Sequence, residues 1–145
     1  MPISKLAHYS IRTSDLEASR RFYTEILGFR AGARPNFDFP GLWLYLGQDE
    51  RDFGIVHLIG IDPDHPDGLA GYLGEKRGEA LVGTGILDHI AYLATGWAET
   101  RQRCEKMAID YTTRVVPSLG LLQIFLLDPS GVTIELNYPA QEAQA

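Results

Sequence analysis

Four side chains of the kinds that bind metal ions lie in apolar, strand-like segments of the chain: His8, His57, His89 and Glu135. The interval from His8 to His57 nearly equals the interval from His89 to Glu135. Three imidazoles and one carboxylate suit Fe²⁺, Mn²⁺, Co²⁺, Ni²⁺ or Zn²⁺, and they leave positions open on a six-coordinate ion. Mg²⁺ and Ca²⁺ instead prefer ligand sets made of oxygen. The residue types and their spacing therefore predict a site for one divalent metal ion of the first group.

Each of these residues on its own has a simpler explanation. A single histidine in a strand is most often a hydrogen-bonded structural residue, and Glu135 alone would fit an edge-strand charge that prevents aggregation. The joint pattern favours a metal site, because three of the four histidines occupy matching positions at strand centres, where a buried imidazole needs a metal or another partner. His65 breaks the pattern and lies in a polar segment, where we expect a solvated side chain.

The elements that would position these residues repeat along the sequence. The strand-like segment LAHYSIRT at 6–13 precedes a helix-like segment, and LDHIAYLA at 87–94 precedes GWAETRQRCEKMAI in the same way. Three strand-like segments, bounded by Gly, Pro or charged residues, follow each helix. The repeat predicts an α+β fold of two tandem βαβββ modules, near 5–60 and 86–139, with eight strands and both helices on the outer face. A connector rich in Gly, Asp and Pro at 61–85 would join them within a single domain of 145 residues.

Strand alternation gives the four candidate ligands a common orientation. Side chains two residues apart share one face of a strand, so Asn137 is expected on the same face as Glu135. The residues expected on the opposite faces, packed beneath the helices, are Ile11, Val56, Ile90 and Ile134. If the two modules join around a pseudo-twofold axis, the four ligands can meet at one point.

The ends of the first helix also have sequence signals. Ser14 and Glu17 have the S-x-x-E spacing of a capping box, which predicts a helix that begins at Ser14. Gly28 stands where a left-handed cap would end that helix near Leu27. A further short helix is expected near 68–73 in the connector.

Composition excludes several classes of function. The net charge is −6 and the pI is about 5.1, so the chain lacks the basic face that nucleic acid binding requires. No apolar run approaches the roughly 20 residues needed to cross a bilayer, and the first ten residues contain no apolar core of a signal peptide. We therefore expect a cytoplasmic protein without membrane contact. Cys104 is the only cysteine and is expected in the core on a helix face, which leaves no disulfide and no cysteine-based zinc site.

Two longer motifs carry a family resemblance from residue 6 to residue 138. The segment LAHYSIRTSDLEASRRFYTEILGF contains D-x-x-x-S-x-x-F-Y-x-x-x-L-G-F, and DPSGVTIELNY contains D-P-x-G-x-x-x-E. The sequence resembles the vicinal oxygen chelate superfamily, which includes glyoxalase I, methylmalonyl-CoA epimerase, fosfomycin and bleomycin resistance proteins, and type I extradiol dioxygenases. The resemblance implies paired βαβββ modules that form an eight-stranded half-open barrel around a divalent ion. That ion binds a small substrate through two vicinal oxygens.

The resemblance also implies roles for the four candidate ligands. His8, His89 and Glu135 match the metal-binding positions of the family. His57 is the position that separates its branches: it would be a fourth ligand in the glyoxalase and epimerase branch, or a second-sphere acid/base in the extradiol branch. Phe125 stands where an extradiol enzyme would carry a tyrosine, and no histidine precedes the D-P-x-G element. These departures favour metal-assisted proton transfer of the lyase or isomerase type over ring cleavage of catechols with Fe²⁺.

Under the proton-transfer interpretation, a residue near the ion must accept a proton. Glu135 is the first candidate and His57 the second. The expected substrate-binding residues are the aromatic side chains Phe37, Phe39, Trp43 and Tyr45, with polar contacts from Ser10 and Gln123. A homodimer is expected because a second copy can cover the exposed sheet edges. A drug-binding resistance protein without catalysis is a further alternative, although such proteins generally lack the metal ligands.

Overall fold

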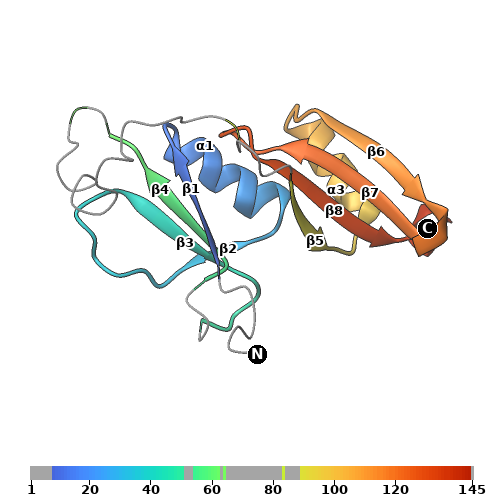
Figure 1. The fold of residues 1–145 in the computed structure, drawn as a ribbon, viewed down its shortest axis with the longest axis horizontal. Coiled ribbons are helices and arrows are strands. Elements are labelled where there is room, and N and C mark those ends of the chain that lie inside the picture. Colours follow the sequence, from blue (N-terminus) through green and yellow to red (C-terminus); the bar gives the residue numbers. More distant parts are fainter. Residues whose placement is uncertain (1–7, 51–53, 63, 65–82, 84–88, 145) are drawn as a thin grey trace. The chain divides into compact units, whose positions relative to one another are not determined.

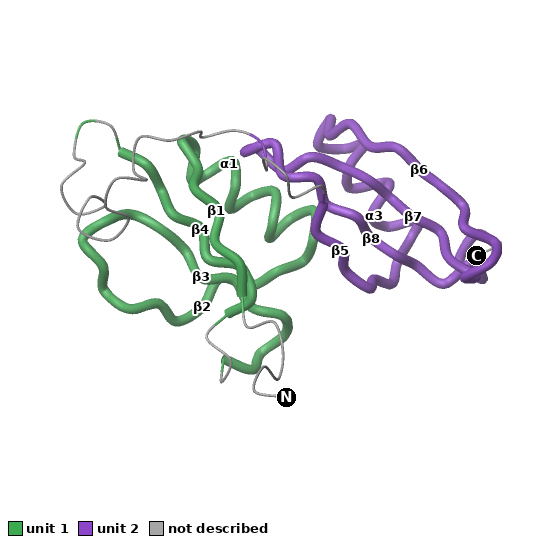
Figure 2. Tube along the Cα trace, in the orientation of Figure 1, with its two compact units in different colours: residues 1–81 green, residues 82–145 purple. Residues whose placement is uncertain are grey.

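The computed structural model describes residues 8–50, 54–62, 64, 83 and 89–144. The chain divides into two compact units, Met1–Leu81 and Val82–Ala145 (Figure 2). His65 and the short helix expected near 68–73 lie outside the described residues. No helix within the described ranges is long and apolar enough to span a membrane.

The described residues of the first unit form the helix α1 and a four-stranded mixed sheet (Figure 1). Its elements are β1 (Tyr9–Thr13), α1 (Leu16–Arg21), the π-helical turn η1 (Phe22–Ile26), β2 (Arg30–Gly32), β3 (Gly41–Tyr45) and β4 (Val56–Gly60). The strand order is β1-β4-β3-β2, in which β1 and β4 are parallel and the other pairs are antiparallel.

The second unit repeats this arrangement. Its elements are β5 (Ile90–Leu93), α3 (Trp97–Lys106), β6 (Tyr111–Val116), the 3₁₀ turn η3 (Pro117–Leu119), β7 (Leu121–Leu127), β8 (Thr133–Pro139) and the 3₁₀ helix η4 (Ala140–Gln144). The order β5-β8-β7-β6 matches β1-β4-β3-β2 strand for strand, with the same parallel pair. The predicted α+β fold with two βαβββ modules is thereby confirmed, and each of the eight predicted strand segments contains a strand.

The strand faces follow the predicted alternation. Each helix covers the apolar face of its own sheet: α1 packs against β4, and Tyr138 on β8 donates a hydrogen bond of 3.0 Å to Thr100 Oγ1 on α3. Cys104 on α3 is fully buried, as the sequence predicted. The predicted core residues Ile11, Val56 and Ile134 are buried, and Ile90 is half-buried.

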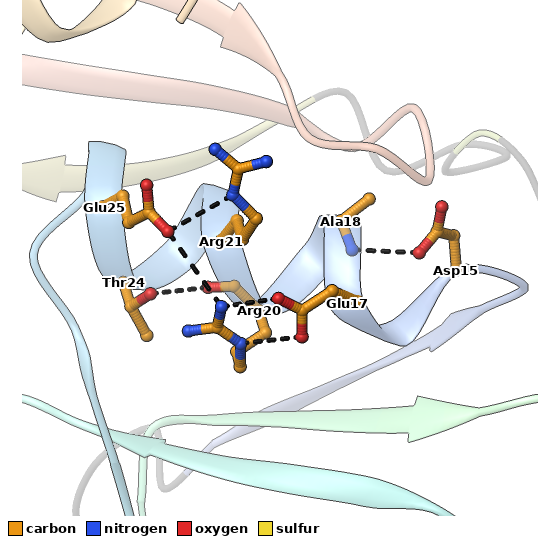
Figure 3. Close-up of polar contacts among 7 residues, drawn as sticks. All are labelled: Asp15, Glu17, Ala18, Arg20, Arg21, Thr24 and Glu25. Carbon is orange, nitrogen blue, oxygen red and sulfur yellow. Dashed lines mark hydrogen bonds and ion pairs between the residues drawn. The ribbon is translucent and has the colours of Figure 1, made fainter.

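The start of the first helix differs from its prediction. Asp15, and not Ser14, is the N-cap, because its Oδ1 accepts a hydrogen bond of 2.9 Å from the backbone N–H of Ala18 (Figure 3). Glu17 does not complete a capping box; it accepts hydrogen bonds of 2.8 and 2.6 Å from the guanidinium of Arg20. These bonds lower the pKa of the Glu17 carboxyl. Ser14 and Asp15 are both strong N-cap residue types, so the sequence pattern alone placed the start one residue early.

The end of the first helix agrees with the prediction. The N–H of Leu27 donates to the carbonyl of Phe22 at 3.3 Å, which is the wider spacing of a π-helical turn. Gly28 then adopts a positive φ of 79°, a conformation that a residue with a Cβ rarely takes. The chain turns at this glycine and enters β2.

Candidate functional site

The first unit places three rings in one stack on the sheet face opposite α1. The ring of His57 lies 3.9 Å from that of His8 and 4.0 Å from that of Trp43, with interplanar angles of 16° and 3°. His57 pairs directly with Trp43 across β3 and β4, and with Ser10 across β1 and β4. The stack therefore brings together side chains from β3, from β4 and from the residue that precedes β1.

Stacking on both faces fixes the plane of the His57 ring. Its side chain lies in a strand in which every residue is buried, and His57 itself is 6% exposed. Because both faces of the imidazole are covered by rings, only the ring edges that carry the nitrogens remain for hydrogen bonds or for a metal ion. His8 is exposed and lies one residue before β1.

The second unit brings together the other two candidate ligands. His89 Nε2 lies 3.2 Å from Glu135 Oε2, and the side chain of Glu135 is 13% exposed. Like His8, His89 lies one residue before its strand, so both histidines differ from the predicted strand-centre position. The hydrogen-bonded pairing of the parallel strands begins at Tyr9 in the first unit and at Ile90 in the second, directly after each histidine.

The two pairs occupy equivalent places in the two sheets. Ser10 pairs with His57 in the first sheet, and Ala91 pairs with Glu135 in the second. His8 lies two residues before Ser10, and His89 lies two residues before Ala91. The register therefore gives His57 and Glu135 matching positions.

Two amides hold the carboxylate of Glu135. Its Oε1 accepts hydrogen bonds of 3.0 Å from Gln123 Nε2 and 2.8 Å from Asn137 Nδ2. Gln123 Nε2 also donates to Asn137 Oδ1 at 2.9 Å, whereas the buried Gln123 Oε1 has no hydrogen-bond partner in the described part of the chain. A buried acceptor without a partner costs about 1–3 kcal/mol. Glu135 thus has Oε1 engaged by the sheet and Oε2 directed to His89.

The turn that precedes β8 explains why this stretch has its particular sequence. Asp128 is buried, and its Oδ1 accepts hydrogen bonds of 2.9 Å from the N–H of Ser130 and 2.8 Å from the N–H of Val132. Gly131 has a φ of 80°. These contacts close the connection between β7 and β8 and fix the register that places Glu135 opposite Phe125.

The predicted substrate-binding residues fall into three groups. Phe39 and Tyr45 are buried: Phe39 packs against Ile59, and the hydroxyl of Tyr45 donates to the carbonyl of Ala33. Ser10 and Trp43 share the sheet face of His57. The ring of Phe37 lies near that of Trp43, with 6.4 Å between the ring centroids. Gln123 is buried in the second unit, where it contacts Glu135.

Two residues near these groups had no role assigned from sequence. Asn137 was expected on the face of Glu135, and this alternation was the signal that could have identified its contact. Arg34 had no such signal: its Nη2 donates to the carbonyl of Phe39 at 2.8 Å, and its guanidinium lies 5.0 Å from the ring centroid of Phe37. Burial lowers the pKa of Arg34.

The donor set fits the predicted metal ions. Each unit supplies one pair, two imidazoles in the first and an imidazole with a carboxylate in the second. In neither unit do the described residues gather three or more His, Cys, Asp or Glu side chains within reach of one ion.

Comparisons with known proteins identify the family of the chain. Residues 5–136 match the family model described as the Glyoxalase/Bleomycin resistance protein/Dioxygenase superfamily. A curated protein of Arabidopsis thaliana named Glyoxylase I 4 is 27% identical over 137 residues, which cover 92% of this chain and 70% of that protein.

Solved structures show the same fold at low sequence identity. A glyoxylase/bleomycin resistance protein/dioxygenase domain from Frankia sp. EAN1pec has a TM-score of 0.66 at 20% identity, covering 94% of this chain and 98% of that one. A fosfomycin resistance protein from Listeria monocytogenes has a TM-score of 0.64 at 15% identity and 99% coverage of both chains. An antibiotic binding protein from Streptomyces has a TM-score of 0.60 at 22% identity, covering 96% and 98%.

Proposed function

Because the chain belongs to the Glyoxalase/Bleomycin resistance protein/Dioxygenase superfamily, we propose that it is a divalent-metal-dependent enzyme. It binds a small oxygenated substrate through two vicinal oxygens and transfers a proton, as a lyase or isomerase. The observation that carries this proposal is the pairing of ligand-type residues at register-equivalent places, His8 with His57 and His89 with Glu135.

This proposal assigns the candidate residues to one divalent ion. His8, His89 and Glu135 bind Fe²⁺, Mn²⁺, Co²⁺, Ni²⁺ or Zn²⁺, and His57 is either a fourth ligand or an acid/base next to the substrate. The fixed plane of the His57 ring supports both roles, because it directs the ring nitrogens before a ligand arrives.

The chemistry follows from the protein groups around the substrate. A bound ion would supply Lewis-acid polarisation of a substrate carbonyl. Glu135 would accept the proton of the adjacent C–H through Oε2, the oxygen that the amides leave unengaged, once that oxygen loosens from the ion. If His57 is not a ligand, its imidazole takes this role, since imidazole is the commonest general base. Trp43 and Ser10 lie beside His57 on the same face and would contact the substrate.

The experiment that tests the proposal measures metal content in five single alanine variants. His8→Ala, His89→Ala and Glu135→Ala are expected to lose most bound metal, because each removes a ligand. His65→Ala, which alters the remaining histidine, is the matched control and should keep full occupancy. Full occupancy in all three ligand variants would overturn the proposal.

His57→Ala separates the two branches of the family. If His57 is a ligand, its variant loses metal; if it is the acid/base, the variant keeps metal and loses turnover. Wild-type protein should exchange the α-proton of α-hydroxycarbonyl compounds in D₂O. Uptake of O₂ with catechols by the Fe²⁺ form would instead identify a ring-cleavage dioxygenase. The residue paired with Glu135 across β7 and β8 is Phe125, where an extradiol enzyme would carry a tyrosine, and this disfavours the dioxygenase alternative.

We further propose that the protein is a cytoplasmic homodimer. Leu93 is 90% exposed and Leu127 is 59% exposed, and strand alternation places both on the sheet face of Glu135. Apolar side chains of this size favour burial against a second surface.

A further inference from the structure

The amide pair beside Glu135 carries an inference about how the carboxylate is held. Gln123 and Asn137 lie directly opposite each other on β7 and β8, and both donate to the same carboxylate atom, Oε1 of Glu135. Oε2, which faces His89, receives no hydrogen bond from either amide. The two oxygens of one carboxylate are therefore in different surroundings.

The orientation of the Gln123 amide is set by the charge of Glu135. Nε2 points to Glu135 Oε1 and Asn137 Oδ1, while Oε1 is buried without a hydrogen-bond partner within the described ranges. A flipped amide would place its oxygen against these two acceptors, with no donor among the three atoms. The sheet thus leaves a buried acceptor unsatisfied in order to direct a donor at the carboxylate.

A purely structural role does not explain this choice of residue. Gln123 lies between Leu122 and Ile124 on β7 and is 8% exposed, so an apolar side chain of similar size would fill the position and remove the unsatisfied Oε1, at the cost of the hydrogen bonds to Glu135 Oε1 and Asn137 Oδ1. A polar amide at such a place is explained when another group needs its hydrogen bond.

We propose that Gln123 and Asn137 are positioning residues, which hold Glu135 Oε1 so that only Oε2 is presented to the metal ion. This inference rests on the proposed function. It assigns Gln123 to the support of a ligand, whereas the sequence had suggested a substrate contact. Residues that orient a metal ligand typically change metal affinity by about 10–100-fold when they are replaced.

The test compares Co²⁺ binding to five proteins: wild type, Gln123→Leu, Asn137→Ala, Glu135→Ala and the control Gln102→Leu. Gln102 is exposed on α3, so its variant makes the same chemical change away from the site. Co²⁺ affinity is measured by titration against a chelating dye, and the visible absorption spectrum of bound Co²⁺ reports its ligand geometry. Thermal unfolding without metal reports the structural role of each residue.

Gln123→Leu and Asn137→Ala are each expected to raise the dissociation constant for Co²⁺ by about 10-fold or more and to alter the Co²⁺ spectrum. Gln102→Leu should match wild type. Gln123→Leu removes the unsatisfied Oε1 but also the donor to Asn137 Oδ1 and one donor to Glu135 Oε1, so thermal unfolding without metal measures this structural cost separately from Co²⁺ binding.

The outcomes separate this inference from the proposed function. Wild-type affinity and spectrum in Gln123→Leu, together with weak binding in Glu135→Ala, would overturn the positioning role and leave the metal site standing. A wild-type protein that binds no Co²⁺ would overturn both. If Gln123→Leu does not fold, Asn137→Ala is judged by the same two measurements.

Discussion

Replacing Asp128 by alanine is expected to lower the free energy of unfolding by about 3 kcal/mol. The Oδ1 atom of Asp128 accepts two backbone hydrogen bonds, 2.9 Å from Ser130 and 2.8 Å from Val132, and all three residues are buried. A hydrogen bond to a charged group contributes about 1.5–3 kcal/mol. The expected loss of stability is the lower end of the sum for the two hydrogen bonds, because water that enters the emptied space can bind the two freed N–H groups.

The assay is urea unfolding followed by tryptophan fluorescence, with two comparison variants. Asp128→Asn keeps an uncharged oxygen acceptor at the same place, and neutral hydrogen bonds are roughly half as strong, so it should lose about half as much stability. Asp110→Ala alters an exposed aspartate and should change stability by less than about 0.5 kcal/mol.

The same variant tests whether the turn positions the carboxylate. Asp128→Ala should also weaken metal binding, because the turn fixes the register of β7 and β8 and hence the place of Glu135. A stability loss below about 0.5 kcal/mol, within the range of an ordinary surface substitution, would refute the reasoning. Equal damage from Asp128→Asn would refute the assignment to a charged acceptor.

Three further predictions concern the second unit and the assembly. Glu142→Ala should lower the free energy of unfolding in urea by about 1 kcal/mol. Glu142 Oε2 accepts hydrogen bonds of 2.9 and 2.7 Å from the N–H groups of Gly96 and Trp97 at the start of α3. An unchanged free energy of unfolding would exclude Glu142 as a cap of this helix. Burial raises the pKa of Cys104 and Tyr138 above their ordinary 9.0 and 10.0. The unfolded chain therefore ionises at lower pH than the folded chain, so the free energy of unfolding should be highest below about pH 9 and fall as the pH rises. The fall should be shallower in Tyr138→Phe than in wild type, and equal slopes in the two proteins would contradict this prediction. Sedimentation should give twice the chain mass of 16.1 kDa, and a 16.1 kDa species at working concentration would refute the dimer.

Local patterns in the sequence were sufficient for the elements and their faces. Alternation with a period of two depends only on the extended backbone, so the apolar faces that carry Val56 and Ile134 could be predicted without knowledge of their partners. The glycine at the end of the first helix was also a local signal, because Gly28 needs its positive φ whatever surrounds it. The N-cap was harder, since Ser14 and Asp15 compete at adjacent positions with similar propensity.

The sequence by itself determined the repeat, the strand faces and the identity of the ligand-type residues, because all three are properties of residue type and spacing. The tertiary structure decided what those residues touch. The stack of His57 between His8 and Trp43 and the hydrogen bonds from Gln123 to Glu135 join different strands. Such contacts depend on strand order and register, which are set by the packing and turns of the whole sheet rather than by any short segment.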